Sequence, residues 1–447
     1  MTGFLPTDRF PLITTSGHRL LQRLQEHPHA PRYTHLGYNR LTLAGLQRAH
    51  DFLVELQTRA GWEPGEIPAW VDEFVAQCYR EAPFYRRDGP PPADFFDLPT
   101  TDRADLSREP WAFVPDSQPL DDLIIYNTSG TTGHPLDILT HPDTLALYIP
   151  LLQAALATHG VTLRSGPDQV GIALICYQKR TYTYAAVLAV LDQAGFVKVN
   201  LNPAEWRSPD DRALFLDDCA PEIYTGDPIA FGELAKLPLR TRPKALVSTA
   251  MTLIAGLKQS LEGRFGCPAI DVYSMNESGP IGVADPNGEG YLLHQPRLYV
   301  EVLDPDGSAC PPGVRGEITL TGGFNPFLPL LRYRTGDYAA LEYRGGQPML
   351  TRLEGRPPTV FRATDGRLVN NVDISIALRP LTITQYALHQ SADGSLRLRV
   401  RGADDLEAVR AALLEVFGSD QRVVVEAVEA LGAGSDKITQ YTSDGGL

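Results

Sequence analysis

Between residues 169 and 275 the chain alternates short apolar runs with longer segments, some of them of helical periodicity. Such alternation is typical of parallel strands joined by crossover helices that cover the sheet. The pattern predicts strands at 170–176, 196–201, 221–224, 244–247 and 269–273, and helices at 184–193 and 253–265. We therefore expect an α/β fold, with mostly parallel sheet flanked by helices and with ligand sites at the carboxyl ends of the strands.

The flanking regions predict further elements. Apolar residues at helical spacing predict paired helices between 45 and 79, and a short amphipathic piece lies at 20–24. A Gly- and Pro-rich, strand-like region from 291 to about 343 predicts a β-rich subdomain. The sequence GRPP at 355–358 predicts a domain boundary, which gives a large N-terminal domain (1–354) and a small α+β C-terminal domain (355–447) with a helix at 406–417.

Composition restricts the classes of partner. The 447 residues are 43% hydrophobic, enough for a large core, and carry a net charge of -14 without any Lys/Arg run, which argues against nucleic acid as a partner. No run of 18 apolar residues exists, so we expect no membrane span, and the first residues do not read as a secretion signal. We expect a cytoplasmic protein with reduced, mostly buried thiols rather than zinc ligands or disulfides, because the five cysteines are widely spaced: Cys78, Cys176, Cys219, Cys267 and Cys310.

A Ser/Thr/Gly-rich segment follows the apolar run at 123–125. It reads YNTSGTTGHP over residues 126–135. Glycines allow backbone N–H groups to approach a ligand closely, and the hydroxyls add donors, a combination that suits phosphate. No Gly-Lys-Ser/Thr closes the segment, so a cation for a bound phosphate must come from elsewhere in the chain. A flexible surface turn is the alternative interpretation.

That segment resembles the phosphate-binding loop of the adenylate-forming enzymes, the acyl-CoA synthetases and their relatives. Further segments resemble the phenylacetate–CoA ligase branch of that superfamily, in the same order and over roughly residues 45–447. They read REAPFYRR (80–87), LPTTDRADL (98–106), YSMNES (273–278), LLRYRTGD (330–337) and GR (355–356). Five collinear matches are far more specific than any one of them.

The resemblance implies a two-step reaction. A carboxylate attacks the α-phosphate of ATP to give an acyl-adenylate and pyrophosphate, and the thiol of CoA then displaces AMP. It also implies Mg²⁺, which prefers hard oxygen ligands and bridges phosphates. Three alternatives remain open: transfer of the acyl group to a carrier protein, transfer to an amine (or transfer of AMP itself), and a non-catalytic nucleotide-binding protein. The oligomeric state is also open, with a homodimer as one option.

The resemblance also assigns roles to individual residues. Glu277 would ligate Mg²⁺, Tyr273 would pack on adenine, and Asp337 would accept hydrogen bonds from the ribose hydroxyls. Arg356 would bind the ribose or the α-phosphate, and Lys437, on a mobile lid, would bring the missing cation. The rest of the nucleotide site would comprise Thr128, Ser129, Gly130, Thr131, Thr132, Gly133, Ser248, Thr249, Ala250, Asn276 and Ser278.

Each assignment has a structural alternative. Glu277 could be a helix cap or a surface carboxylate, and Tyr273 could be a core residue. Asp337 could belong to an ordinary Gly-Asp turn. Arg356 could be a surface arginine at the domain junction, and Lys437 could be a solvated residue of the tail.

Several positions depart from the family pattern. Pro357 and Pro358 follow Gly-Arg where the family has a flexible hinge, and proline fixes φ and removes the N–H donor. In the family, rotation about this hinge exchanges the adenylation and thiolation conformations, so the prolines place CoA transfer in more doubt than adenylation. Asp436 precedes the lysine where the family has glycine, and Leu136 stands where many superfamily members have lysine.

The acid pocket is less defined. Tyr177, Tyr182 and Tyr184 follow a predicted strand at the position where the family lines its acyl cavity. Interleaved aromatic side chains suit a flat aromatic acid, although they could equally be packing residues. Which carboxylic acid would be bound does not follow from the sequence.

Overall fold

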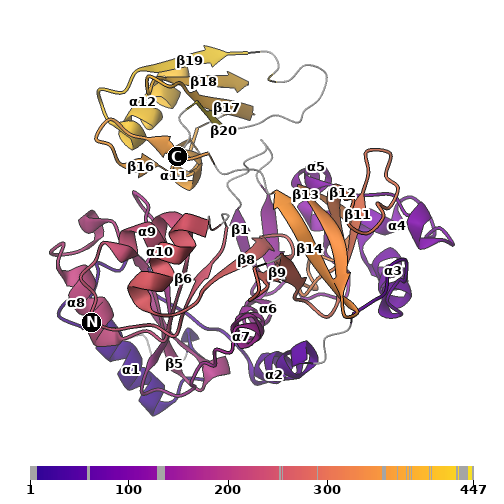
Figure 1. Cartoon of the computed structure of the whole chain (residues 1–447), viewed down its shortest axis with the longest axis horizontal. Coiled ribbons are helices and arrows are strands. Elements are labelled where there is room, and N and C mark those ends of the chain that lie inside the picture. Colours follow the sequence, from indigo (N-terminus) through magenta and orange to yellow (C-terminus); the bar gives the residue numbers. More distant parts are fainter. Residues whose placement is uncertain are drawn as a thin grey trace.

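The computed structural model describes residues 8–57, 61–127, 136–250, 253, 255–288, 290–354, 359–369, 371–378, 380–381, 383, 385–401, 403, 405–428, 431 and 441–444. Three parts are visible in Figure 1: an α/β part on the left, a β-rich part on the right and a small C-terminal part above them. A single twelve-stranded sheet runs through the left and right parts, in the order β11-β12-β13-β14-β10-β9-β8-β7-β6-β3-β5-β4.

One half of this sheet is parallel, as the alternating pattern predicts. Its strands are β3 (Val170–Cys176), β5 (Ala194–Asn200), β6 (Ile223–Gly226), β7 (Ala245–Ser248) and β8 (Ala269–Met275). Helices α8 (Asp211–Cys219), α9 (Pro228–Ala235) and α10 (Ala255–Phe265) contribute to the apolar cluster on one face, and α7 (Tyr148–Thr158) contributes to the cluster on the other. The five predicted strands and the helix predicted at 253–265 are confirmed.

The helix predicted at 184–193 is wrong. This segment forms an edge strand, β4 (Tyr184–Leu188), antiparallel to β5, followed by the short 3-10 helix Ala189–Leu191. The left-handed residues Asp192 (φ 47°) and Gln193 (φ 71°) then turn the chain directly into β5. A short apolar run with flanking aromatics fits a strand as well as a helix, and the sheet edge supplies the pairing that decides between them.

The N-terminal helix α1 (Thr15–Gln25) packs on β4 and β5. Its apolar stripe, Leu20, Leu21 and Leu24, is buried in the same cluster as the residues of β4. The buried Gln193 side chain anchors the preceding segment, because its amide donates to the Leu12 carbonyl at 3.1 Å and accepts from the Thr14 N–H at 3.3 Å. The chain passes from β3 to β5 through the strand β4 and not through a long helix. Helix α1 of the N-terminal segment therefore covers this part of the sheet.

The other half of the sheet is antiparallel and forms the predicted β-rich region. Its strands are β9 (Gly279–Ala284), β10 (Tyr291–Leu293), β11 (Leu298–Leu303), β12 (Arg315–Gly322), β13 (Leu330–Arg344) and β14 (Gln347–Glu354). Because β8 pairs with β7 in parallel and with β9 antiparallel, the two halves are continuous. The helices of the N-terminal third are α2 (Leu43–Gln57), α3 (Trp70–Glu81), α4 (Pro83–Arg86) and α5 (Arg103–Arg108), with 3-10 turns Phe95–Asp97 and Pro110–Phe113. The helices predicted between 45 and 79 are thus present, but not as a pair: α2 packs on α6 and α7, and α3 packs on α4 and β12.

A separate hairpin brackets the Ser/Thr/Gly-rich segment. Strand β1 (Ile124–Asn127) pairs antiparallel with β2 (Asp137–Thr140), and Asn127 lies opposite Asp137. The short helix α6 (Pro142–Leu145) follows β2. The two strands therefore carry both ends of the predicted phosphate loop.

The C-terminal part has its own core. Strands β17 (Gln385–Gln390), β18 (Leu396–Arg401), β19 (Val423–Ala427) and β20 (Tyr441–Ser443) form a sheet in the order β19-β18-β17-β20. Helices α11 (Asn371–Leu378) and α12 (Leu406–Phe417) and the pair β15 (Phe361–Arg362) and β16 (Leu368–Val369) share that apolar core. The helix predicted at 406–417 is confirmed. The division at 355 remains a prediction, because residues 355–358 lie outside the described residues.

The C-terminal part contacts the loop that follows β3. The Lys179 backbone N–H donates to Asp373 Oδ1 of α11 at 3.1 Å. The Lys179 ammonium donates to the Glu415 main-chain carbonyl of α12 and lies 3.4 Å from the Glu415 carboxylate. We call this set of contacts between Lys179, Asp373 and Glu415 the docking contact.

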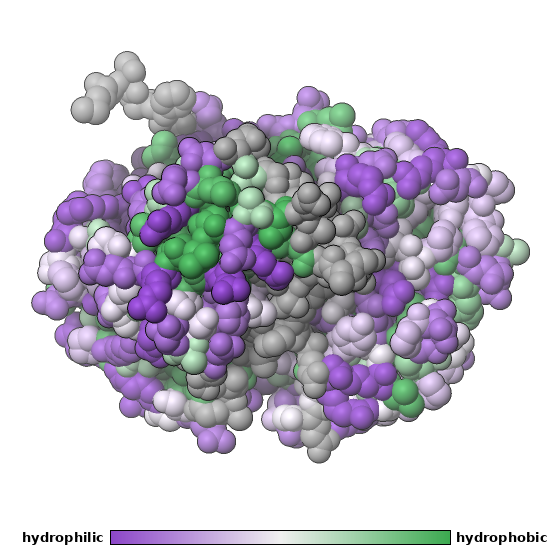
Figure 2. Space-filling model, turned by 90° about the horizontal axis from the view of Figure 1, so that it is seen from above, coloured by the Kyte–Doolittle hydropathy of each residue, from purple (hydrophilic) through white to green (hydrophobic). Residues whose placement is uncertain are grey.

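The surface seen from above is largely hydrophilic, with a small apolar area left of centre (Figure 2). Within the part of the chain that the structure describes, none of the helices has the length and apolar character needed to cross a bilayer.

Candidate active site

Three segments that the resemblance predicts in the nucleotide site meet near the carboxyl end of β8. The hydroxyl of Tyr126, on β1, donates to the main-chain carbonyl of Asn276 at 3.3 Å. The hydroxyl of Tyr333, on β13, donates to Glu277 Oε1 at 3.1 Å. Thus the hairpin that carries the Ser/Thr/Gly-rich segment, the 273–278 segment and the 330–337 segment are joined by hydrogen bonds at one place.

Glu277 is buried and already has a cationic partner. Its side chain is 2% exposed, and Oε1 lies 2.6 Å from Arg103 Nη1. Arg103 is the first residue of α5, which Asp102 caps by accepting from the N–H groups of Ala104 and Asp105. The sequence does not assign a role to Arg103, although the LPTTDRADL motif that contains it points to this segment. The interpretation of Glu277 as a surface carboxylate does not agree with its burial.

The residues present fit Mg²⁺ only together with a nucleotide. Among the described residues, no group of three or more His, Cys, Asp or Glu side chains is placed to hold a metal ion. Mg²⁺ often binds through one or two carboxylates, with phosphates and waters as its other ligands. Glu277 can supply one such oxygen, and Arg103 beside it can compensate its charge when no cation is bound.

Tyr273 and Asp337 form a second pair within the site. The Tyr273 hydroxyl donates to Asp337 Oδ2 at 2.9 Å, and the Asp337 N–H donates to Thr335 Oγ1 at 3.1 Å. Burial, reinforced by the Asp337 charge, raises the pKa of Tyr273 well above its usual value, so the phenol stays protonated and remains a donor. Gly336, at φ 79°, lies next to Asp337 where the pairing of β13 with β12 is irregular, and glycine adopts this φ without strain. The hydrogen bond between Tyr273 and Asp337 therefore fixes the orientation of the Asp337 carboxylate.

The two arginines of the 330–337 segment act structurally. Arg332 is buried, and its guanidinium forms a two-bond pair with Glu301, at 3.2 and 3.1 Å. It also donates to the carbonyls of Phe96 (2.6 Å) and Leu98 (2.9 Å). Arg334 pairs with Glu317, with 2.8 Å between Nε and Oε2. These bonds hold β13 against β11, β12 and the 96–98 segment.

The end of β7 supplies another part of the predicted site. Ser248 is buried and lies opposite Gly226 of β6 and Asp271 of β8 in the sheet register. Its hydroxyl has no hydrogen-bond partner among the described residues. Thr249 N–H donates to the Gly226 carbonyl at 2.9 Å, and Ala250 has φ 69°, which is strained for a residue with a Cβ. Of the remaining predicted residues, Ser278 is buried and Asn276 is exposed.

Several predicted site residues lie outside the described part of the chain, and their assignment remains a prediction. They are Lys437, Arg356 and the loop residues Thr128, Ser129, Gly130, Thr131, Thr132 and Gly133.

The three tyrosines predicted for the acid pocket have different surroundings. Tyr182 is 61% exposed, and its ring lies 4.3 Å from that of His35. Tyr184, on β4, stacks on Phe196 of β5 with ring centroids 5.8 Å apart. Tyr177 is half-buried and contacts the apolar cluster on the α9 side. Tyr184 and Phe196 thus form an aromatic pair on the sheet edge, whereas Tyr182 lies on the surface.

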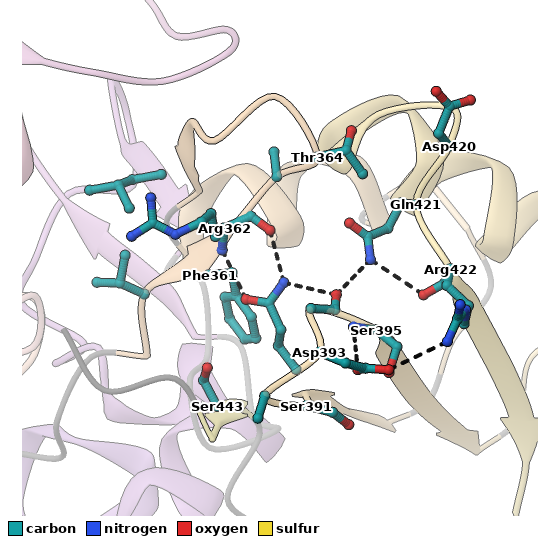
Figure 3. A pocket seen from close by; sticks show the side chains of 16 residues that line it. Phe361, Arg362, Thr364, Ser391, Asp393, Ser395, Asp420, Gln421, Arg422 and Ser443 are labelled. Carbon is teal, nitrogen blue, oxygen red and sulfur yellow. Dashed lines mark hydrogen bonds and ion pairs between the residues drawn. The ribbon is translucent and has the colours of Figure 1, made fainter.

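A cavity of about 400 Å³ lies within the C-terminal part (Figure 3). The Gln390 side chain lines this cavity; it accepts from the Arg362 N–H and donates to the carbonyls of Arg362 and Gly394. Gln421 donates to the Gly394 carbonyl at 2.7 Å. Of the predicted site residues that the structure describes, none lines this cavity.

The chain resembles known proteins in sequence. No protein-family model matches the chain. The phenylacetate-coenzyme A ligase of Aromatoleum evansii is 26% identical over 353 residues, which cover 72% of this chain and 77% of that protein. The phenylacetate-coenzyme A ligase of Escherichia coli (strain K12) is 23% identical over 369 residues, 76% of this chain and 80% of its own length.

A solved structure supports the fold. The crystal structure of 2-hydroxyisobutyryl-CoA ligase, in complex with 2-HIB-AMP and CoA, superposes with a TM-score of 0.55 at 19% identity and covers 92% of each chain. At this identity the likeness concerns the fold, and the sequence relatives supply the closer relationship. In sequence the chain is similar to phenylacetate-coenzyme A ligases, and in fold it is similar to a solved acyl-CoA ligase.

Proposed function

We propose that this protein is an AMP-forming acid–CoA ligase. It activates a carboxylic acid, in our proposal an aromatic one, as an acyl-adenylate with release of pyrophosphate, and then transfers the acyl group to CoA. The observation that carries the proposal is the hydrogen bond from Tyr126 to the Asn276 carbonyl. It joins the hairpin of the Ser/Thr/Gly-rich segment to the segment with the buried carboxylate Glu277, and phosphate groups and their counter-ion need these two features side by side.

The first step brings two anions together, so the protein must neutralise charge and hold an in-line geometry. The loop from Thr128 to Gly133 would hold the β- and γ-phosphates through N–H and hydroxyl donors. Bound Mg²⁺ would supply charge neutralisation at the phosphates, with Glu277 as its protein ligand. Arg103, 2.6 Å from Glu277, is placed to hold this carboxylate before nucleotide binds.

The nucleoside would be held at the other pair. Asp337 would accept hydrogen bonds from the ribose hydroxyls, with Tyr273 fixing the orientation of the carboxylate through the bond at 2.9 Å. Tyr273 would also present its ring to adenine, with Ser248, Thr249, Ala250, Asn276 and Ser278 around it and Arg356 at the ribose or α-phosphate. Lys437 would bring the cation for the α-phosphate from the C-terminal part when this closes as a lid.

A second candidate function differs in the molecule that accepts the acyl group from the adenylate. Pro357 and Pro358 follow Gly-Arg at the predicted hinge, and two prolines restrict rotation there. A chain that adenylates well and rotates poorly would pass its acyl group to an acceptor other than CoA, such as a carrier protein or an amine.

Pyrophosphate release separates the candidates. The purified chain is incubated with ATP, Mg²⁺ and a panel of aromatic acids that includes phenylacetate, with and without CoA. We expect acid-dependent pyrophosphate, and an acyl-CoA product when CoA is present. Acid-dependent pyrophosphate without acyl-CoA would favour the second candidate, and the absence of pyrophosphate with every acid would contradict an adenylating function.

A further inference from the structure

Strand β19 forms one edge of the sheet in the C-terminal part, and within the described residues its pairing partner is β18 alone. The Arg422 carbonyl accepts from an N–H of β18, and the Val428 N–H donates to a carbonyl of β18, both at 2.8 Å. The even-numbered residues therefore bond to β18, and the backbone groups of Val423, Val425 and Ala427 face away from the sheet. None of the hydrogen bonds among the described residues uses these outward groups.

The two edges of the large sheet, in contrast, are covered by other segments of the chain. Beside β4, the Asn39 amide donates to the Val187 carbonyl at 3.2 Å. Beside β11, the Cys310 N–H donates to the Val302 carbonyl at 2.7 Å. Proteins cover an edge, or protect it with Lys, Pro or a bulge, because free backbone groups pair readily with another chain. Strand β19 reads VVVEA, so it contains neither Lys nor Pro, and its pairing with β18 shows no bulge.

The side chains along β19 make this strand complementary to a second copy of itself. By strand alternation, Arg422, Val424 and Glu426 lie on the outer face of the sheet, where Val424 is 47% exposed. A two-fold axis at Val424 sets two β19 strands antiparallel, with Arg422 opposite Glu426 of the partner subunit at both ends. In the same register Val423 lies opposite Val425 of the partner subunit, and their outward backbone groups form the hydrogen bonds of an antiparallel pair.

Charge selects this register among those that the backbone allows. Moving one strand by two residues in one direction brings Glu426 towards Asp420 of the partner subunit, which has the same charge. Moving it by two residues in the other direction places Glu426 opposite the apolar Val424 of the partner subunit. Of these registers, the one centred on Val424 alone gives pairs of opposite charge on both sides of an apolar pair.

The two charged residues have only loose, exposed ion pairs within the chain. The Arg422 guanidinium lies 3.4 Å from the Asp393 carboxylate. The Glu426 carboxylate lies 3.8 Å from the Arg397 guanidinium. Surface pairs of this kind contribute little, so both side chains are available for pairs across an interface. In Figure 1, β19 lies at the top of the C-terminal part, so neither the α/β part nor the β-rich part covers it.

We propose that β19 is the interface of a homodimer, in which two copies pair antiparallel about a two-fold axis at Val424 and join their C-terminal sheets. A two-fold contact is closed, so association stops at two copies. The strand has five residues, which makes the interface small, and we therefore expect reversible association with a dissociation constant on the order of micromolar or weaker. The dimer does not depend on the reaction proposed above.

Sedimentation velocity of the full chain over a range of concentrations tests the proposal. We expect a reversible equilibrium between monomer and dimer in the wild type. Glu426→Arg and Arg422→Glu each place like charges opposite one another at both ends of the pair, so each should weaken the dimer by about tenfold or more. The double variant Arg422→Glu/Glu426→Arg restores opposite charges at both ends and should restore the dimer.

Mixing the two single variants gives a sharper test. Neither should associate with itself, but a chain with Arg422→Glu is complementary to a chain with Glu426→Arg, so the mixture should form a heterodimer. The matched control is Asp444→Arg, directly after β20 at the opposite edge of the same sheet. It changes the charge by the same amount and should dimerise like the wild type.

Thermal melting checks the fold of each variant. If a single charge variant unfolds, Val424→Lys decides the result instead, because it places like charges on the two-fold axis at an exposed position and should abolish the dimer. The proposal is wrong if the wild type stays monomeric at every concentration or assembles beyond a dimer. It is also wrong if the folded single variants dimerise like the wild type, or if their mixture does not associate.

Discussion

At the scale of single residues, the Arg103–Glu277 pair is the feature with most consequence for chemistry. A carboxylate that is 2% exposed is stable only with a partner, and Arg103 fills that role at 2.6 Å. Nucleotide phosphates and their Mg²⁺ would offer each member of the pair a new partner of opposite charge. The Arg103–Glu277 ion pair therefore stabilises the buried Glu277 carboxylate before substrate binds.

We expect Glu277→Gln to lower the rate of acid-dependent pyrophosphate release by about 10²- to 10³-fold, in the range seen when a single electrostatic group at the reacting centre is removed. The dependence of the rate on Mg²⁺ concentration should shift to higher concentration in the same variant. Glu73→Gln, an exposed carboxylate on α3, is the matched control. A rate within a few-fold of the wild type would show that Glu277 serves the fold and not the reaction.

The sequence predicts which segments belong to the site but not how their residues pair. The 273–278 and 330–337 segments are identified as site segments, and the structure joins them through the Tyr273–Asp337 and Tyr333–Glu277 bonds. The roles inside a motif are not visible in the sequence: Arg332 and Arg334 bind Glu301 and Glu317, which lie on other strands of the sheet. Such pairings depend on strand register, a property of the whole sheet.

At the scale of elements, the docking contact links the C-terminal part to the loop after β3. Burial raises the pKa of Asp373 to about 6, and the nearby Asp227 adds to this effect, while Lys179 and Arg367 oppose it. In a released C-terminal part, Asp373 would return towards its ordinary value of 3.8. Docking is therefore strongest when Asp373 is protonated, and it weakens as the pH rises through about 6.

We expect the radius of gyration, measured by small-angle scattering between pH 5 and 8, to increase with pH as the C-terminal part is released. Asp373→Asn should remove this step, because the amide keeps an acceptor for the Lys179 N–H and does not titrate. Glu415→Gln should weaken docking across the whole range and leave the step in place. An unchanged pH response in Asp373→Asn would contradict the assignment.

Helix α1 and strand β4 show why one element was predicted wrongly. The apolar residues at 184–193 fit a helix and a strand about equally well. The segment forms a strand because β5 pairs with it and because helix α1 (Thr15–Gln25) packs on it. No window of sequence around residue 188 contains that information.

We expect Leu24→Ala to lower the free energy of unfolding by about 2–5 kcal/mol, because this side chain is 2% exposed within the cluster that joins α1 to β4. Chemical denaturation measures the change. The neighbouring exposed Arg23→Ala should have an effect within about 0.5 kcal/mol. Equal effects for the two variants would mean that α1 does not contribute to the core.

At the scale of the whole molecule, the two halves of the large sheet share β8, and the residues of the site lie around the end of that strand. A continuous sheet moves as a unit, so a group that arrives during the reaction has to come from outside it. The C-terminal part is the segment placed to do so, and it is where the sequence places Lys437.

We expect Lys437→Ala to depress adenylation strongly while ATP binding stays within a few-fold of the wild type, since a lysine on a closing lid acts in the reaction more than in ground-state binding. Pyrophosphate release and equilibrium binding of a non-hydrolysable ATP analogue measure the two effects. Lys236→Ala is the control for loss of one surface charge. Adenylation at the wild-type rate would show that the cation comes from another residue.

The packing of α1 on β4 also has a consequence for biosynthesis. Leu20, Leu21 and Leu24 leave the ribosome long before Tyr184 begins the strand that buries them. At about 5–20 residues per second, their apolar stripe would wait roughly ten to thirty seconds for its partner. The nascent chain therefore exposes the apolar side of its N-terminal helix during most of the time in which the first half of the protein is synthesised. This interval is when a holdase chaperone would be needed, and a faulty β4 would leave that helix free to cause aggregation.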